Sequence, residues 1–252
     1  KGILKFLKWF MLINKIKVKQ YQIIIAGDLY SLIGLNKKKS NTIFYDLRDF
    51  FDNLTILKNR PLKKIFWSVM EKICLRSVDT VLTSSMEDSF LCKRKFKKFN
   101  HLKYLTIFNF PLFGRFKKNN YLHNKFKIKK KHKILIYQGV VEKGRGIGLM
   151  IKQISNLKNA VFVIVGSGKD LSFYKQKTAS LELEKQIFFH NKVPYHSLFK
   201  LTSSADIGVA LIKPDSKNNI HVLPNKLFEY ALCQIPVICS NMPSMVRFIK
   251  KY

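Results

Sequence analysis

Residues 221–239 bring a histidine, an amide and a carboxylate close to the start of a predicted helix. Pro224 suits the first turn of that helix, where its missing N–H costs nothing. Leu227, Tyr230 and Ala231 recur at helical spacing, so the helix is expected to bury one face. A helix start of this kind offers free N–H groups and a favourable dipole to an anion such as phosphate.

Asn225 and Glu229 are four residues apart and share another face of the same predicted helix. A carboxylate one turn inside a helix start is poorly placed to bind phosphate itself. It is well placed to accept hydrogen bonds from a sugar diol attached to that phosphate. A buried helix start with Glu229 on the surface is the alternative interpretation.

A glycine-rich basic turn follows an apolar run at residues 133–138. Glycines at 139, 144 and 146 allow a ligand to approach the backbone, and Arg145 can bind a phosphate with two hydrogen bonds. The pattern predicts a phosphate cradle, with a flexible basic turn as the alternative. It is not a Walker loop, because no Gly-Lys-Ser/Thr follows.

Gly166 and Gly168 resemble a shortened dinucleotide-binding fingerprint, but Leu171 stands where a third glycine belongs. The next strand ends at residues 188–190 with no acidic residue to hold an NAD ribose, which argues against nicotinamide binding. No Asp-x-Asp motif or carboxylate cluster suggests a divalent cation site, so neither a metal nor a cofactor is expected. No GxSxG motif or Cys/His pair suggests a nucleophile.

The chain of 252 residues is long enough for two domains and carries 47 Lys and Arg against 15 Asp and Glu, a net charge of +32. Such an excess suggests an anionic partner, whether nucleic acid, a membrane surface or a phosphorylated ligand. Only seven of these cations are arginine, and the accompanying richness in Ile, Asn and Phe also fits drift in coding composition. Four cysteines without a CxxC pair fit a reducing compartment.

No apolar run reaches the length of a membrane span. Residues 3–13 mix apolar side chains with lysines, which favours a helix on the first strand or on a membrane surface over a secretory signal. The chain starts at Lys and its last residues, 246–252, look like a helix cut in mid-course. Both ends therefore suggest a fragment of a longer protein.

The first half alternates short apolar runs with helical patterns. Strands are expected at 22–26, 41–45, 79–83 and 102–108. Pro61 opens a helix that runs to Arg76, with Ile65, Val69, Ile73 and Trp67 on or near its apolar side. Residues 84–87 predict a second helix start with the Ser and Glu of a capping box. The strand at 22–26 is expected to be buried.

Residues 112–131 are polar, basic and without a clear period, so they are interpreted as a linker or a long surface connection. Beyond them the alternation of strands and helices is more regular, which predicts a parallel sheet covered on both faces. Ligands bind outside the carboxyl ends of such strands. The loops that should carry a site follow residues 138, 165, 190, 211 and 240.

Together these segments resemble the donor domain of the retaining glycosyltransferases of family four (glycosyl transferases group 1), which have the GT-B fold. The resemblance covers residues 133–249 in the family's order and rests on Tyr137-Gln138-Gly139 with Lys143-Gly144-Arg145-Gly146, Val163-Ile164-Val165-Gly166-Ser167-Gly168, Asn191-Lys192-Val193-Pro194-Tyr195 with Ser204-Ala205-Asp206-Ile207-Gly208, and Leu223-Pro224-Asn225-Lys226-Leu227-Phe228-Glu229-Tyr230 with Ile235-Pro236-Val237-Ile238. Weaker matches in the first half are Phe44 to Asp49, Ser77 to Ser85 and Ile107 to Pro111.

The resemblance implies an α/β protein with two Rossmann-like parallel-sheet domains facing a cleft, the N-terminal one incomplete. The expected divisions are a partial acceptor-side domain at 1–112, a basic linker at 113–131 and a nucleotide-sugar-binding domain at 132–252. Family members have further strand–helix units before this start and helices that return to the first domain.

The resemblance also implies roles for individual residues. Glu229 matches the second Glu of the family's Glu-seven-residues-Glu motif, which holds the nucleotide ribose, and Arg145 takes the place of a phosphate-binding Lys. The full expected donor-binding set is Gly139, Arg145, Gly166, Gly168, Val193, His221, Asn225, Lys226, Leu227 and Glu229. Val193 would lie beside the base, and the glycines would let the backbone approach the donor.

Three positions depart from the family pattern. His221 replaces the first Glu of the motif, which suggests a different sugar preference, a weakened site or an ordinary loop histidine. Val140 stands where many members have a second phosphate-binding Arg, so Lys226 or the helix start must carry more of the phosphate charge. Arg48 replaces a His of the N-terminal segment.

The expected function is metal-independent transfer of a sugar, with retention, from a nucleotide-diphosphate sugar to a glycan or lipid-linked acceptor in polysaccharide synthesis. Asp28, Asp46 and Asp49 end predicted strands and are the candidates for acceptor contacts. The expected location is the cytoplasm, with peripheral contact on an anionic inner membrane face. The rivals are an inactive truncated remnant and a basic protein that binds nucleic acid, although no RNA-recognition signature supports the last.

Overall fold

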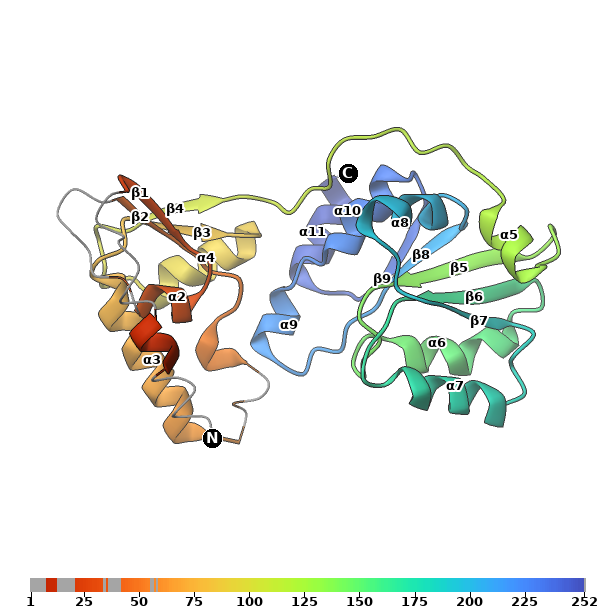
Figure 1. The fold of residues 1–252 in the computed structure, drawn as a ribbon, viewed down its shortest axis with the longest axis horizontal. Helices are drawn as coiled ribbons and strands as arrows, with labels where there is room; N and C mark the ends of the chain where they lie inside the picture. Colours follow the sequence, from red (N-terminus) through yellow and green to blue (C-terminus); the bar gives the residue numbers. More distant parts are fainter. Residues whose placement is uncertain are drawn as a thin grey trace. The chain divides into compact units, whose positions relative to one another are not determined.

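The computed structural model describes residues 8–12, 21–33, 35, 42–54, 57 and 59–251, and it contains two compact units (Figure 1). Unit 1 comprises Lys1–Phe108 and Ser216–Val222, and unit 2 comprises Asn109–Asp215 and Leu223–Tyr252. Residues 8–12 of the apolar opening segment are helical, and the rest of that segment lies outside the described residues.

Unit 1 is built on a parallel sheet with strand order β1-β2-β3-β4. Its strands are β1 (Ile23–Ala26), β2 (Thr42–Asp46), β3 (Thr80–Thr83) and β4 (Lys103–Thr106), and its helices include α2 (Leu29–Ile33), α3 (Pro61–Leu75), α4 (Met86–Lys95) and α9 (Lys217–His221). Each strand pairs with the next in sequence, so right-handed crossovers place α2, α3 and α4 on the same face. The core lies between that face and the helices, where Tyr45, Val81 and Leu75 are fully buried.

The strand predicted at 22–26 is buried on one side only, which corrects the expectation of a buried strand. Ala26 packs in the core, whereas Ile23 and Ile25 are 62% and 65% exposed. Successive side chains of a strand point to opposite faces, so an unbroken apolar run does not by itself place both faces in a core.

Helix α3 begins with Pro61 at its first position, as predicted. Its apolar side, however, points away from the sheet: Ile65, Val69 and Ile73 are exposed. The buried side carries Glu71 and Leu75 instead. Helical spacing identifies which residues share a face, but it does not identify which face meets the core.

Helix α4 starts within the predicted residues 84–87. Ser85 is the N-cap and accepts a hydrogen bond from the backbone N–H of Asp88 at 3.0 Å. The Ser85 hydroxyl also donates to the Asp88 carboxylate at 2.8 Å. A serine therefore caps the helix as predicted, but Asp88 at the third helical position takes the place of the predicted Glu.

Unit 2 contains a second parallel sheet, with strand order β7-β6-β5-β8-β9. Its elements are α5 (Tyr121–Phe126), β5 (Lys133–Gln138), α6 (Ile147–Gln153), β6 (Ala160–Val165), α7 (Leu171–Ser180), β7 (Ile187–His190), α8 (Tyr195–Thr202), β8 (Ile207–Ala210), α10 (Asn225–Leu232), β9 (Val237–Cys239) and α11 (Pro243–Lys251). Figure 1 shows α6 and α7 on one face of this sheet and α8 and α10 on the other. The predicted α/β class with two parallel sheets is therefore confirmed.

The order of strands reverses direction between β5 and β8, which lie side by side. In open parallel sheets the crevice outside the carboxyl ends of two such strands is the usual ligand site. Here β5 ends at Gln138 and β8 ends at Ala210. A ligand is therefore expected at the loops that follow these two residues.

The contacts group residues 109–131 with unit 2, although Leu112 and Phe113 are 91% and 88% exposed. The Lys118 ammonium donates to the Ala205 carbonyl at 2.6 Å, and Phe116 stacks on Phe199 with 4.5 Å between ring centroids. Leu122 of α5 is fully buried. From Phe116 on, the predicted linker is therefore packed on unit 2.

All four cysteines are free. Within the described ranges, no helix combines the length and the apolar character needed to cross a lipid bilayer.

Candidate functional site

Helix α10 is fixed to the sheet of unit 2 by a buried tyrosine. The Tyr230 hydroxyl lies 3.2 Å from the carbonyl oxygens of both Ile136 and Val209, on neighbouring strands β5 and β8. Its ring occupies the space that a Cβ at Gly208 would need, since that atom would lie 2.4 Å from the ring. Ala231, predicted on the buried face, is exposed, because Tyr230 and Leu227 supply the contact with the sheet.

Glu229 is only 7% exposed and lies at the end of a chain of polar side chains. The Gln138 side-chain amide donates to the Glu229 carboxylate, and the Thr202 hydroxyl donates to the Gln138 carbonyl oxygen at 2.7 Å. Tyr195 gives Glu229 a further hydrogen bond. The alternative interpretation of Glu229 as a surface residue is therefore wrong.

Burial raises the pKa of Glu229, whereas the hydrogen bonds from Gln138 and Tyr195 and the charge of Lys226 lower it. A carboxylate held this way has a defined orientation and few competing waters. Buried polar groups of this kind are normally fully hydrogen-bonded, and a ligand hydroxyl can complete such a set.

Lys226 lies over an aromatic ring next to a second cation. Its Nζ is 3.8 Å from the centroid of the Tyr137 ring. Burial and the nearby Arg145 charge lower the pKa of Lys226 to about 7, and Glu229 opposes this shift. Two cations that repel each other in this way create a local excess of positive potential, which is the electrostatic requirement of a site for a diphosphate.

The glycines in the two loops beside β5 and β6 are required by the packing of those loops against each other. A Cβ at Gly166 would lie 1.9 Å from the Gly139 carbonyl oxygen, and one at Gly168 would lie 2.2 Å from the Val141 carbonyl oxygen. Gly139 and Gly166 also have φ of 130° and 149°, which L side chains rarely adopt. These glycines therefore have a role in packing. That they also let the backbone approach the donor stays a prediction.

The remaining predicted donor residues are spread more widely. Asn225 is exposed in the first turn of α10, Val193 is partly buried in the loop after β7, and Leu227 is 1% exposed, so only its backbone can face a ligand. His221 ends α9, which the contacts group with unit 1. The structure therefore brings together Glu229, Lys226 and Arg145, but it does not bring His221 into this set within unit 2.

The three predicted acceptor-side carboxylates each have a local partner in unit 1. Asp28 accepts hydrogen bonds from the Ser31 N–H and hydroxyl at 2.7 and 2.5 Å, so it caps α2. Asp46 forms an ion pair with Arg48 at 3.1 Å. Asp49 accepts a hydrogen bond from the Asn218 side chain at 3.2 Å.

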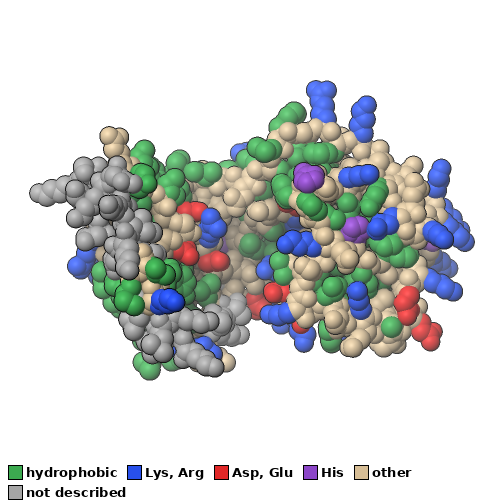
Figure 2. Space-filling view, viewed as in Figure 1, with side chains coloured by type: hydrophobic (Ala, Val, Ile, Leu, Met, Phe, Trp, Pro, Cys, Tyr) green, Lys and Arg blue, Asp and Glu red, His purple; other side chains and the backbone are tan. Residues whose placement is uncertain are grey.

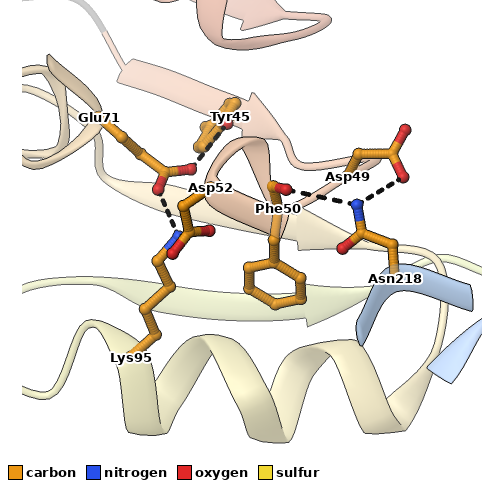
Figure 3. Close-up of polar contacts among 7 residues, drawn as sticks. All are labelled: Tyr45, Asp49, Phe50, Asp52, Glu71, Lys95 and Asn218. Carbon is orange, nitrogen blue, oxygen red and sulfur yellow. Dashed lines mark hydrogen bonds and ion pairs between the residues drawn. The ribbon is translucent and has the colours of Figure 1, made fainter. Parts of the chain in front are cut away.

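Sequence reasoning missed a buried charge network in unit 1 (Figure 3). The Lys95 ammonium donates to Glu71 at 2.7 Å and to Asp52 at 2.8 Å, and the Tyr45 hydroxyl lies 3.3 Å from Glu71. Burial raises the pKa of Glu71, while Lys95 opposes the shift. The only sequence signal was a lone Glu within the otherwise apolar and basic pattern of α3.

A cavity of about 380 Å³ adjoins this network. It is lined by Phe50, Asp52, Asn53, Leu91, Arg94, Lys95 and His221. Over the part of the chain that the structure describes, no three His, Cys, Asp or Glu side chains are grouped so as to hold a metal ion.

A family model described as "Glycosyl transferases group 1" matches residues 119–252, more than half of the chain. A search of curated proteins found no match.

Solved structures with a similar fold cover nearly the whole chain. Sucrose-phosphate synthase from Thermosynechococcus elongatus is 15% identical with a TM-score of 0.72, over 95% of this chain and 62% of that one. Anabaena Alr3699/HepE in complex with UDP-glucose is 13% identical with a TM-score of 0.71, over 96% and 64%. The pneumococcal O-GlcNAc transferase GtfA in complex with UDP and GlcNAc is 13% identical with a TM-score of 0.66, over 93% and 44%. The chain thus spans less than two thirds of the length of these proteins.

Proposed function

We propose that this chain, which belongs to the glycosyl transferases group 1 family, binds a nucleotide-diphosphate sugar and transfers the sugar to a second molecule. The acceptor is a glycan or a lipid-linked glycan, and the transfer proceeds with retention at the anomeric carbon. The expected setting is polysaccharide synthesis in the cytoplasm. The observation that carries the proposal is the buried, oriented Glu229 carboxylate beside Lys226 and Arg145, at the point where the strand order reverses.

Each of the three side chains has a definite task in this proposal. Glu229 accepts hydrogen bonds from the ribose hydroxyls, since its orientation is fixed by Gln138 and Tyr195. Lys226 and Arg145 stabilise the diphosphate as negative charge develops on it during departure of the sugar. Two cations and the helix start at Asn225 supply the positive potential, so the reaction is proposed to need no metal ion.

The protein's part in the reaction is therefore positioning and electrostatic stabilisation. Support for a uridine nucleotide comes from the neighbours, because HepE and GtfA are described in complexes that contain UDP or UDP-glucose. Acceptor contacts by Asp28, Asp46 and Asp49 remain a weaker proposal, since each carboxylate already has a local partner.

A nucleic-acid-binding function has less support from the surface. Lys and Arg side chains are spread over the visible face of unit 2 in Figure 2, between hydrophobic and neutral ones. A protein that tracks a nucleic-acid backbone gathers its cations along a groove or stripe. The experiment below tests whether the donor site is intact, and the absence of any thermal shift would favour the remnant hypothesis.

The proposal is tested by the thermal stabilisation that UDP-, GDP-, CMP- and dTDP-sugars give to the chain. One class is expected to raise the melting temperature, and both Glu229→Ala and Arg145→Ala are expected to abolish the rise. The matched controls are Glu184→Ala and Lys152→Ala, which remove exposed charges of the same sign elsewhere in unit 2. Equal shifts in all variants, or none in the parent, would refute the site.

A further inference from the structure

A groove of about 710 Å³ opens on unit 2 between the segment before α5 and the turn that joins α10 to β9. Residues 113–118, Ala205, Asp206 and residues 231–236 line it, and we call it the linker groove. Asp206 and Pro236 directly precede β8 and β9, so the groove lies at the amino ends of these strands. The donor site lies at the opposite, carboxyl ends, so the two sites are separate parts of unit 2.

The base of the linker groove is apolar and held in place. Cys233 and Ile235 are buried, and Leu232 is half-buried. The ring of Phe116 is stacked on Phe199 at an interplanar angle of 13°, which fixes that wall of the groove. A pocket of this size, whose apolar walls are already formed, suits a small organic ligand.

The lining also contains three cations. Lys118 donates to the Ala205 carbonyl at 2.6 Å and forms an ion pair with Asp206 at 3.2 Å. Arg115 and Lys117 are exposed, and neither forms an ion pair with any residue that the structure describes. The groove therefore offers two cations whose charge is not matched by an acidic neighbour.

Asp206, the one acidic residue in the lining, does not offset these two charges. Its carboxylate accepts a hydrogen bond from the Ile134 N–H at 2.8 Å and lies 3.2 Å from the Lys118 ammonium and 3.7 Å from that of Lys133. Its negative charge is therefore matched by its own partners, and an anion in the groove meets a net positive potential.

The C-terminal end of α10 is closed by its own backbone. The Tyr230 carbonyl accepts a hydrogen bond from the Ile235 N–H at 3.2 Å, and the Ala231 carbonyl accepts one from the Gln234 N–H at 3.0 Å. Gln234 has a φ of 56°, the left-handed conformation in which many helices end. Because these carbonyls are hydrogen-bonded, the negative end of the helix dipole opposes an anion less strongly.

Charge and size decide between the candidate occupants. A second copy of the chain would bring two basic surfaces together, since the net charge of the chain is +32. A nucleic acid needs a longer row of cations than two. A small aromatic ligand fits the lining, because Phe113 and Phe116 offer ring contacts and a guanidinium stacks on aromatic faces.

We propose that the linker groove binds a small aromatic anion, with its ring against the apolar base and its phosphate, sulfonate or carboxylate group between Arg115 and Lys117. Arginine suits such groups because its guanidinium forms two parallel hydrogen bonds to them. The ligand contacts the last turn of α10, about 12 Å along the helix from its start. The inference does not rest on the proposed function, because it uses neither Glu229 nor Lys226.

The test titrates the 252-residue chain with anilinonaphthalene sulfonate, an aromatic anion whose fluorescence rises in an apolar site. Saturable binding is expected, and in heteronuclear NMR spectra the dye should shift the amide signals of Phe116 and Gln234. A saturating UDP-sugar should leave the dye bound. Glu229→Ala, a variant of the donor site, should bind the dye with the affinity of the parent.

A pair of charge variants separates the groove from general attraction of an anion to a basic protein. Arg115→Ala/Lys117→Ala is expected to bind the dye about tenfold more weakly, because two exposed ionic contacts are lost. The matched control, Lys152→Ala/Lys158→Ala, removes the same charge from exposed sites elsewhere in unit 2 and is expected to change the affinity less than twofold.

A second pair of variants tests the apolar part of the groove. Ala231→Phe fills the groove from an exposed position of α10 and is expected to weaken binding of the dye at least tenfold. Ala179→Phe adds the same side chain at an exposed position of α7 and is expected to change the affinity less than twofold. Thermal melting verifies that each variant is folded.

Other outcomes would overturn the proposal. Equal weakening by the two charge variants would mean that net charge alone attracts the dye. Displacement of the dye by a UDP-sugar, or amide shifts confined to unit 1, would place the dye at another site. Absence of saturable binding, or unchanged affinity in Ala231→Phe, would exclude a ligand of this class from the groove. Failure of the donor-site experiment would leave each of these conclusions unchanged.

Discussion

Lys226 is predicted to take up a proton when the donor binds. Its pKa is lowered from 10.5 to about 7, first by burial and then by repulsion from Arg145. A diphosphate beside the ammonium reverses the electrostatic balance and restores the charged form. At pH 8 the free side chain is then about one-tenth protonated and the bound one almost fully protonated, so binding takes up about 0.9 proton. At pH 6 the uptake is only about 0.1 proton.

The same linkage sets the pH dependence of affinity. Above pH 7 the free protein must first bind a proton, so donor affinity is expected to fall about tenfold per pH unit, or about 1.4 kcal/mol. Below pH 7 the affinity should level off, because Lys226 is already charged. A nucleotide sugar is the right probe, since both of its phosphates are esterified and do not titrate in this range.

Isothermal titration calorimetry in two buffers with different ionisation enthalpies measures the proton uptake at pH 6 and pH 8. Lys226→Arg is the control, because a guanidinium stays charged throughout and should bind with no uptake at either pH. Equal uptake at pH 6 and pH 8 in the parent would refute the reasoning. So would an undiminished uptake at pH 8 in Lys226→Arg.

Three further predictions concern residues whose contacts stabilise the folded state of the two units. Gln138→Leu leaves the Glu229 carboxylate without its buried donor, and we expect a loss of about 1–3 kcal/mol in the free energy of unfolding by urea. Lys95→Met leaves the buried Glu71 uncompensated, with an expected loss of about 3–5 kcal/mol. Because burial raises the pKa of Glu71, this variant should regain stability as the pH falls and Glu71 is protonated. The added change Glu71→Gln should restore the stability at neutral pH. A loss of stability that does not depend on pH would contradict this reasoning. Gly166→Ala places a Cβ 1.9 Å from a backbone oxygen at φ of 149°, so we expect a fall in melting temperature of more than 10 °C.

The strands and helices of unit 2 were predictable because its pattern is regular. Strand β6 is fully buried, as its unbroken apolar run predicts for a strand within a sheet that helices cover on both faces. In unit 1 the same signals were ambiguous. Ile25 belongs to an apolar run yet is exposed, and the apolar side of α3 points outward. Local periodicity reports which side chains share a face, whereas burial depends on what packs against that face.

Part of the candidate site could be predicted from the sequence. Lys226 and Glu229 lie on one predicted helix, and the family resemblance added Arg145 from a distant loop. Gln138 is 91 residues from Glu229, so its hydrogen bond to that carboxylate has no local signal. The pairing of Lys95 with Glu71, 24 residues apart, was hidden for the same reason.

The central claim, that Glu229 holds the ribose of a nucleotide sugar, is tested most directly by a double-mutant cycle on protein and ligand. Calorimetry would compare UDP with its 2′,3′-dideoxy analogue on the parent and on Glu229→Ala. The account predicts that the parent binds the analogue about ten- to a hundredfold more weakly than UDP, from a lost charged hydrogen bond of about 1.5–3 kcal/mol, while Glu229→Ala binds both alike. Equal discrimination by the parent and by Glu229→Ala would contradict it.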